Sequence, residues 1–338
     1  MMRPKHTRVA IIIVFTILFC THYSFGQGSS LNQVGTSMAN FLKIGVGARA
    51  ASMGDAYVAL ADDASSLYWN PGGLGMLRKN EIIFQTTDWI LDSKLYFLGL
   101  AYKINWLGVF GISFYSFSSG DIKETTIYYP NGTGNTFQTS NLAVGISFSR
   151  QITDRFSTGF TVKYIYEQLY LEKASTVGID VGSLFVTDFL NNLRIGFALS
   201  NLGGRMQLNG AGLGFRRTSG IKTYQAEYST EPWDIPLLFR FGLATDLVKR
   251  DYYRMTVAIE ALDTRDFTNR LSIGSEIAFQ ETVFLRGGYK FDFDETDLTV
   301  GGGVKINLLR GLEMNVDYAF GNFVVFNNYH RFSIVMAF

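Results

Sequence analysis

The sequence predicts an exported all-β protein, a transmembrane barrel of fourteen antiparallel strands with an N-terminal segment that closes it. Three observations support this fold: an N-terminal export signal, a period of two residues along most of the chain, and connections that alternate between long and short. Together they indicate a chain that crosses a lipid bilayer with strands rather than helices.

Residues 1–26 have the three parts of a secretory signal peptide. A basic start is followed by an apolar run, VAIIIVFTILFC, and by a short polar stretch with small residues. The apolar run is too short for a helix that spans a bilayer, which needs about 20 residues. We expect cleavage near Gln27. Phe19 before Cys20 is too bulky for a usual lipoprotein cleavage site, so we expect no lipid anchor.

The composition of the predicted mature chain excludes several kinds of site. Removal of residues 1–26 removes the single Cys and leaves His330 as the last His, so no disulfide framework can form. Loss of three basic residues takes the net charge from +1 to about −2, and no basic nucleic-acid surface is expected. Yet the full sequence is 47% hydrophobic and 15% aromatic, and the mature part has no run long enough for a membrane helix.

Alternation explains this apolar content. In NLAVGISFS (141–149) every second residue is large and apolar, and the intervening residues are small or polar, as on the two faces of a strand. A soluble sandwich alternates as well, but apolar-out and polar-in segments of about ten residues are typical of a transmembrane barrel. The polar face also carries charges: Arg240, Asp246, Arg254, Glu260, Glu276, Arg286, Lys290, Lys305, Glu313 and Asp317.

Residues 81–338 are the predicted barrel. Its candidate strands begin near 81, 94, 107, 138, 155, 173, 193, 235, 252, 271, 283, 297, 312 and 330. Connections after odd-numbered strands include the long ones, 119–137, 202–234 and 262–270, whereas those after even-numbered strands are short turns. Bacterial barrels have an even strand number, long external loops and short periplasmic turns. The last strand alternates up to Phe338, which resembles the signal read by the outer-membrane insertion machinery.

Residues 27–80 precede the first strand and do not alternate. They contain GARAASMGDAYVALADDASSLYWNPGGLG, whose small side chains suit close packing and whose polar groups suit a wet lumen. Asp62 or Asp63 is placed to cap a short helix, which Asn70 and Pro71 would end. Because a barrel of this size has a lumen too wide for its wall side chains to fill, we predict that this segment is a hatch.

The same stretch resembles the N-terminal signature of the PorV/PorQ family of outer-membrane proteins, which is related to the FadL-type transporters of hydrophobic compounds. The resemblance covers about 30 residues and continues beyond them only as a pattern of strands. Gly72 departs from it, because Asn-Pro is usually followed by Ala. The hatch residues within the matching motif are Gly47, Arg49, Gly54, Asp55, Asp62, Asp63, Trp69, Asn70 and Pro71.

The resemblance implies a FadL-like barrel without enzymatic activity in the outer membrane of a Gram-negative, Bacteroidetes-type bacterium. In PorV-like proteins the barrel serves type IX secretion, where it binds cargo that leaves the translocon and transfers it to the surface-attachment machinery. In FadL-like proteins hydrophobic molecules pass the hatch and leave through the wall. The implied partners are outer-membrane lipid and lipopolysaccharide, the translocon and its cargo, or a hydrophobic ligand, with no nucleic acid and no cofactor.

Two kinds of residue are candidates for function. Loops on a rigid scaffold commonly carry contact residues, and the aromatic residues of the two longest loops are Tyr128, Tyr129, Phe215 and Trp233. Arg49 in the hatch needs carboxylate partners, which the inward-facing acids can provide. It is either a structural tie or a latch that releases on binding, and the sequence favours the tie.

Two other chemistries are not favoured. Some outer-membrane barrels are enzymes with a nucleophile and a His base, but His330 stands alone at the start of the last strand. The acidic tip FDFDETD offers carboxylate oxygens for calcium but lacks the glycine and the distal Glu of an EF-hand loop. We therefore predict no catalytic or metal site, and a solvated tip able to bridge to lipopolysaccharide through a divalent ion. The acids of this tip are Asp292, Asp294, Glu295 and Asp297.

Overall fold

A computed structural model describes residues 35–219, 222–293, 296–309, 311–323 and 328–338. The predicted signal peptide lies outside these residues, as do Asp294 and Glu295 of the acidic tip. Among the described residues, no helix is long and apolar enough to cross a membrane.

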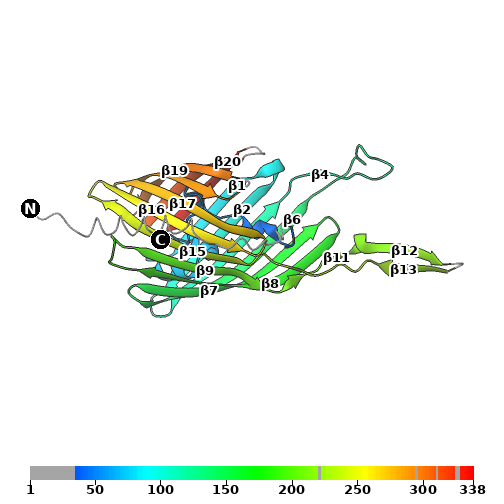
Figure 1. Cartoon of the computed structure of the whole chain (residues 1–338), viewed down its shortest axis with the longest axis horizontal. Coiled ribbons are helices and arrows are strands. Elements are labelled where there is room, and N and C mark those ends of the chain that lie inside the picture. The colour runs from blue at the N-terminus through cyan, green and yellow to red at the C-terminus, as the bar shows by residue number, and fades with distance from the viewer. Residues whose placement is uncertain (1–34, 220–221, 294–295, 310, 324–327) are drawn as a thin grey trace, which may run out of the picture. The chain divides into compact units, whose positions relative to one another are not determined.

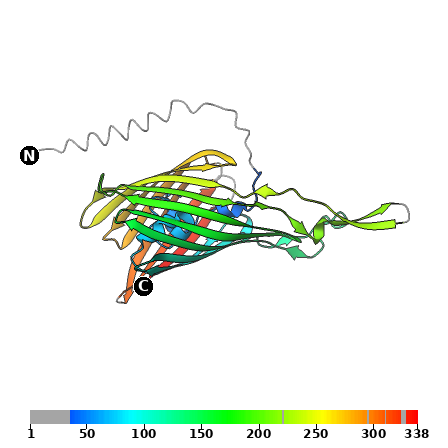
Figure 2. The same cartoon turned by 90° about the horizontal axis from the view of Figure 1, so that it is seen from below.

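Fourteen long antiparallel strands form a closed barrel, which confirms the predicted fold (Figures 1 and 2). Each pairs with the next, the last pairs with the first, and pairing of β8 with β9 completes the circle. A closed sheet leaves no backbone edge facing lipid. The strands are β1 (Glu81–Asp88), β2 (Lys94–Ile104), β3 (Gly108–Ser118), β6 (Thr139–Thr153), β7 (Phe156–Leu169), β8 (Glu172–Val186), β9 (Arg194–Gly203), β15 (Leu238–Lys249), β16 (Tyr253–Thr264), β17 (Phe267–Phe279), β18 (Val283–Phe291), β19 (Thr296–Leu309), β20 (Leu312–Phe323) and β21 (Tyr329–Ala337).

The long loops lie at one end of the barrel, here called the outer end, and the short turns lie at the other, the inner end. The loops contain short elements that alternation does not predict, and β12 with β13 forms a hairpin that projects from the outer end (Figure 1). These elements are η3 (Ile90–Asp92), β4 (Ile122–Lys123), β5 (Thr136–Phe137), β10 (Arg205–Met206), β11 (Asn209–Gly210), η4 (Ala211–Leu213), β12 (Gly214–Ser219), β13 (Lys222–Glu227) and β14 (Trp233–Asp234).

One predicted connection is wrong. We expected a loop at 262–270, but β17 begins at Phe267 and pairs with β16 almost to its end, which leaves a tight turn. The polar run before Leu271 resembles a loop in sequence. It is strand because Arg270 faces the lumen, where a charged side chain is buried without contacting lipid.

The two faces of the sheet divide as predicted. On β6, Ile146 faces outward and is 64% exposed, whereas Ser147 beside it faces the lumen and is 1% exposed. Charged side chains of the polar face, such as Arg240 and Asp317, are buried inside the barrel. The apolar side chains therefore cover the outside of the barrel. The charged side chains buried in the lumen need polar partners there.

Residues 35–80, called the hatch below, supply those partners by running the length of the lumen. At the outer end, the Met38 N–H donates to the Asp234 carbonyl oxygen at 3.0 Å. At the inner end, Lys79 Nζ lies 2.9 Å from the carbonyl oxygen of Gly311 in the β19–β20 turn. The hatch contains only short helices: η1 (Asn40–Lys43), α2 (Ala48–Ser52), α3 (Ser66–Trp69) and η2 (Pro71–Met76).

Candidate functional site

Small residues bring the hatch backbone against the wall. Gly54 has a φ of +66°, and a Cβ built on it would lie 3.0 Å from the backbone nitrogen of Tyr289 in β18. A Cβ on Gly72 would lie 2.6 Å from the Cα of Ser183 in β8. This contact gives a physical reason for Gly72 where the family motif has Ala: the wall backbone occupies the position of the methyl group.

Asn70 joins the hatch to itself and to the wall. Its Nδ2 donates to the carbonyl oxygens of Val58 in the hatch and Ser183 in β8, both at 3.0 Å, and its Oδ1 accepts from Gly72 N–H at 3.0 Å. The side chain is fully buried, so these bonds satisfy an amide that water cannot reach. Pro71 follows as the first residue of η2, where its missing N–H is not needed.

Trp69 fills the lumen beside a wall arginine. It is 1% exposed and donates from Nε1 to the Val46 carbonyl oxygen at 2.6 Å. The Arg240 guanidinium lies 4.9 Å from its ring centre and 5.5 Å from the ring centre of Tyr68. Arg240 also pairs with Glu260 at 3.4 Å. The aromatic end of the motif thus packs on a buried charge pair of the barrel.

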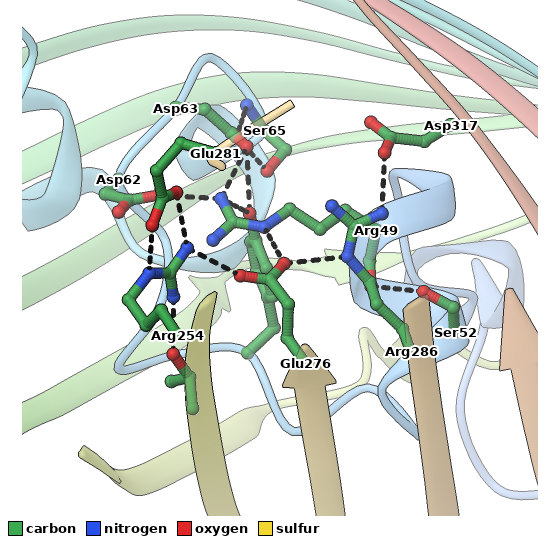
Figure 3. A network of polar contacts seen from close by, with 12 residues as sticks. Arg49, Ser52, Asp62, Asp63, Ser65, Arg254, Glu276, Glu281, Arg286 and Asp317 are labelled. Atoms are coloured by element: carbon green, nitrogen blue, oxygen red, sulfur yellow. Dashed lines mark hydrogen bonds and ion pairs between the residues drawn. The ribbon is translucent and has the colours of Figure 1, made fainter. Parts of the chain in front are cut away.

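Arg49 lies between the hatch acids and the wall (Figure 3). Its Nη1 contacts Asp62 at 2.8 Å, Asp63 at 3.4 Å and the Tyr57 hydroxyl at 3.1 Å. Its Nε lies 3.2 Å from Glu276 of β17. One guanidinium, through Nη1 and Nε, therefore links two parts of the hatch to the barrel.

Glu276 is the centre of the wider network in Figure 3. It accepts from Arg286 at 2.7 Å and from Arg254 at 3.1 Å, in addition to Arg49, and it is 1% exposed. Arg286 also forms an ion pair with Asp317, at 2.6 Å. Arg254 also donates a hydrogen bond to Glu281 in the β17–β18 turn, at 2.7 Å. This hydrogen bond lowers the pKa of the Glu281 carboxyl.

Asp55 makes a second ion pair with the wall. It follows Gly54 in a left-handed turn, with a φ of +61°, and contacts Lys290 Nζ at 2.5 Å.

Asp63 has a local role as well, because its Oδ1 accepts from the Ser65 N–H at 2.8 Å just before α3. This contact forms a turn ahead of α3 and is not a helix cap, because the N-cap residue of α3 is Ser65 and no described side chain caps the helix. The prediction that Asp62 or Asp63 caps this helix is therefore wrong. Gly47 donates its N–H to the Gln85 side chain of β1.

At the outer end of the barrel, a cavity of about 340 Å³ lies between Thr36 and Ser37 of the hatch and loop residues that include Trp233 and Asp234. A smaller cavity between the hatch and the wall has a volume of about 20 Å³. It is lined by residues that include Leu42, Tyr68, Phe97 and Tyr115. A volume of this size holds about one water molecule.

The aromatic loop residues lie at the outer end but on separate elements. Tyr128 and Tyr129 are 88% and 64% exposed between β4 and β5. Phe215 on β12 stacks on Tyr228 with ring centres 4.5 Å apart. Trp233 on β14 pairs with β10 and is 44% exposed.

The loop that carries Tyr128 is ordered by a carboxylate. Glu124 accepts hydrogen bonds from the Thr133 hydroxyl at 2.7 Å, the Tyr170 hydroxyl at 2.7 Å and Asn135 Nδ2 at 3.1 Å. These bonds lower the pKa of Glu124 to about 2. The same contact raises the pKa of the Tyr170 hydroxyl.

Sequence reasoning named the inward-facing charges but missed their hatch partners. Glu260 accepts the N–H groups of Tyr57 and Val58, both at 2.8 Å, and the Ser333 hydroxyl accepts the Ala48 N–H at 3.0 Å. The only sequence signal was a carboxylate or hydroxyl on the lumenal face. Within the described ranges, no group of three or more His, Cys, Asp or Glu could hold a metal ion.

The chain is similar to known proteins in its sequence family and in its fold. Residues 27–264 match the family model described as "Type IX secretion system protein PorV", and no curated protein sequence is significantly similar. The toluene transporter TodX of Pseudomonas putida shares the fold at 13% identity with a TM-score of 0.54, covering 86% of this chain and 97% of TodX. TbuX, the Ralstonia pickettii toluene transporter, shares it at 12% with a TM-score of 0.55, covering 87% and 97%.

A FadL homologue of Pseudomonas aeruginosa is also similar, at 12% identity and a TM-score of 0.51, covering 85% of this chain and 96% of that one. At such low identities the likeness to solved structures concerns the fold, whereas the family match covers more than half of this chain. The chain therefore belongs to the PorV family of type IX secretion proteins, and it folds as a FadL-like outer-membrane barrel.

Proposed function

We propose that this barrel is a non-enzymatic component of type IX secretion that binds secreted cargo at its outer end and transfers it to the surface-attachment machinery. The observation that carries the proposal is a hatch that lies inside the barrel and is joined to its wall by ion pairs and hydrogen bonds. The outer end, in contrast, carries long loops with exposed aromatic side chains. A closed barrel with elaborate outer loops suits a binding scaffold better than a conduit.

The hatch contacts support a lumen that stays closed. They lie at different heights: Lys43 with Asp266 at 2.5 Å near the outer end, Asp55 with Lys290 in the lumen, and Asn70 with β8. Opening the hatch would break all of them together. We infer that Arg49 is a structural tie, because buried ion pairs of this kind are expensive to separate.

The outer aromatic residues are the proposed cargo contacts. Tyr128, Tyr129 and Trp233 present large rings to solvent, and Tyr and Trp are enriched among residues that dominate binding energy. The Glu124 hydrogen bonds hold the first of these loops in shape before binding. A preformed loop loses less conformational entropy when it binds a partner.

A pull-down of the tagged barrel from native membranes in mild detergent tests the proposal. We expect secreted proteins or the translocon among the proteins recovered, and their loss in the variant Tyr128→Ala/Tyr129→Ala. Tyr252→Ala is the matched control, because Tyr252 is 71% exposed in the β15–β16 turn at the opposite end. Recovery of the barrel alone, with bound lipid or fatty acid, would contradict the proposal.

The second candidate is a FadL-like channel for small hydrophobic molecules, and the shared fold with the toluene transporters favours it. Its test is uptake of radiolabelled toluene into liposomes that contain the purified barrel. Uptake above that of empty liposomes would support the channel. Because the hatch is tied to the wall by ion pairs and hydrogen bonds, we expect none.

A further inference from the structure

A polar cavity opens on the outside of the barrel, at the outer end of β7 and β8. In the register of these strands Lys173 lies opposite Gln168, and Ser175 lies opposite Tyr166. Opposite residues of an antiparallel pair share a face. The buried Ala174 between the two lies on the lumenal face, so the side chains of Lys173 and Ser175 point away from the lumen.

The cavity lies at the edge of the apolar outer surface. Along β8 the outward residues Val181, Ile179 and Val177 are 41%, 41% and 52% exposed. Ser175 and Lys173 occupy the next two outward positions. The change from aliphatic to polar side chains marks the level where hydrocarbon gives way to lipid headgroups.

The chain after β9 encloses this position. β9 ends at Gly203, and β11 then pairs with the outer end of β8, with Asn209 opposite Lys173. The Gln207 side chain is fixed by donation to the Thr230 carbonyl oxygen at 2.7 Å. The resulting cavity has a volume of about 250 Å³. Its lining residues are Tyr166, Lys173, Ala174, Ser175, Arg205, Gln207 and Asn209.

The cavity carries positive charge that its own lining does not neutralise. The side chain of Lys173 is exposed, and its ammonium group has no hydrogen-bond or ion-pair partner among the residues that the structure describes. Arg205 Nε contacts Asp234 at 3.0 Å, but the other oxygen of this carboxylate contacts Arg265 at 2.6 Å. One carboxylate is therefore shared by two guanidinium groups. Glu172 adjoins Lys173 but points to the other face of the strand.

We propose that this cavity binds a phosphate group of lipopolysaccharide, the anionic glycolipid of the outer leaflet. Arg and Lys side chains bind phosphate through short charge-assisted hydrogen bonds. The Tyr166, Ser175 and Asn209 side chains supply further polar groups around it. A lipid-bound phosphate fits better than free phosphate because the cavity, with Ser175 and then Lys173, follows the aliphatic band that the acyl chains of the lipid would cover. The proposal rests on the outer-membrane fold and does not depend on cargo binding.

Binding of bis-phosphorylated lipid A to the purified full-length barrel in detergent, with chelator present, tests this inference. We expect Lys173→Gln/Arg205→Gln to weaken binding by about tenfold or more, and Lys173→Gln alone to weaken it measurably. The matched control is Lys94→Gln, because Lys94 also faces outward at the outer end but lies opposite Asp88. Heat-modifiable migration on a gel shows that each variant is folded.

Two results would overturn the inference. The first is unchanged affinity in the double variant, or an equal loss in Lys94→Gln, which would indicate a diffuse charge effect. The second result would come from a competition experiment with the bound lipid A as probe. We expect that dephosphorylated lipid A does not displace the probe and that inorganic phosphate at millimolar concentration displaces little of it. If dephosphorylated lipid A competes as well as the phosphorylated form, the cavity does not recognise the phosphate group. If inorganic phosphate displaces the probe fully, the cavity is a site for free anions instead.

Discussion

Glu276→Gln is the most informative single change in the hatch network. Glu276 is contacted by three guanidinium groups, at 3.2 Å from Arg49, 3.1 Å from Arg254 and 2.7 Å from Arg286. The substitution keeps the size of the side chain and removes its charge. Three cations then surround a neutral amide inside the lumen.

The magnitude follows from these distances. A unit pair about 3 Å apart is worth on the order of 5 kcal/mol at an effective dielectric constant of about 20, before desolvation is subtracted. Breaking a buried ion pair by removing one partner costs about 3–5 kcal/mol net. We expect Glu276→Gln to lower the free energy of unfolding by about that much. Arg49→Met should cost less, about 1.5–3 kcal/mol, because Glu276 keeps two arginine partners.

Urea unfolding of the purified barrel in detergent, followed by tryptophan fluorescence, measures the overall cost. Glu313→Gln is the matched control, because Glu313 also contacts two cations, Lys79 and Lys305, but is 33% exposed. Its loss should cost about 0–1 kcal/mol. Opening of the hatch alone is measured by thiol labelling of Ser66→Cys, at a fully buried hatch position. Arg49→Met should raise this labelling about tenfold or more.

Three results would contradict these expectations. If Glu276→Gln unfolds within about 1 kcal/mol of the parent chain, the network contributes little to stability. If Arg49→Met costs more than Glu276→Gln, Arg49 rather than Glu276 is the centre of the network. Unchanged labelling of Ser66→Cys in Arg49→Met would show that Arg49 does not restrain the hatch.

The remaining predictions concern one close contact and one loop. Gly72→Ala should lower the unfolding midpoint by overpacking against Ser183, at a cost of about 1–3 kcal/mol; Gly287→Ala, with nothing within 4 Å of its Cβ, should leave it unchanged. Hydrogen bonds put the pKa of Glu124 at about 2, below its ordinary 4.5. Protection of this loop from hydrogen exchange should therefore persist above pH 4.5 and decrease as the pH falls toward 2. In Glu124→Gln the protection should not change over this pH range. If the variant shows the same decrease, a group other than Glu124 causes it.

The barrel could be predicted from the sequence because its signal is local. A period of two residues places Ile146 outside and Ser147 inside without knowledge of any partner. The start of β17 was missed because Arg270 is polar on the lumenal face, and a short polar run has the composition of a loop. The β12–β13 hairpin was missed because its strands are short and lie outside the apolar band.

The hatch contacts could not be predicted, because they depend on register across the whole chain. Arg49 meets Glu276 across 227 positions, and Asn70 meets Ser183 across 113. The residue types were visible in the sequence: an arginine among small residues, acids on the lumenal face and an Asn before Pro. Which of them pair is decided by how far the hatch enters the barrel, and no local pattern encodes that depth.

We propose that the barrel acts at its outer end while its lumen stays closed. The most direct test of this proposal is secretion through a barrel whose hatch is locked. Asp55→Cys and Lys290→Cys replace an ion pair of 2.5 Å, and a short reducible thiol cross-linker would join hatch to β18. The predicted mature chain has no other cysteine.

We predict that cross-linked cells release and surface-attach their cargo at the rate of the same double-cysteine strain without cross-linker. Loss of secretion on cross-linking, restored by a reductant, would contradict the account, because it would mean that the hatch must move for the barrel to work.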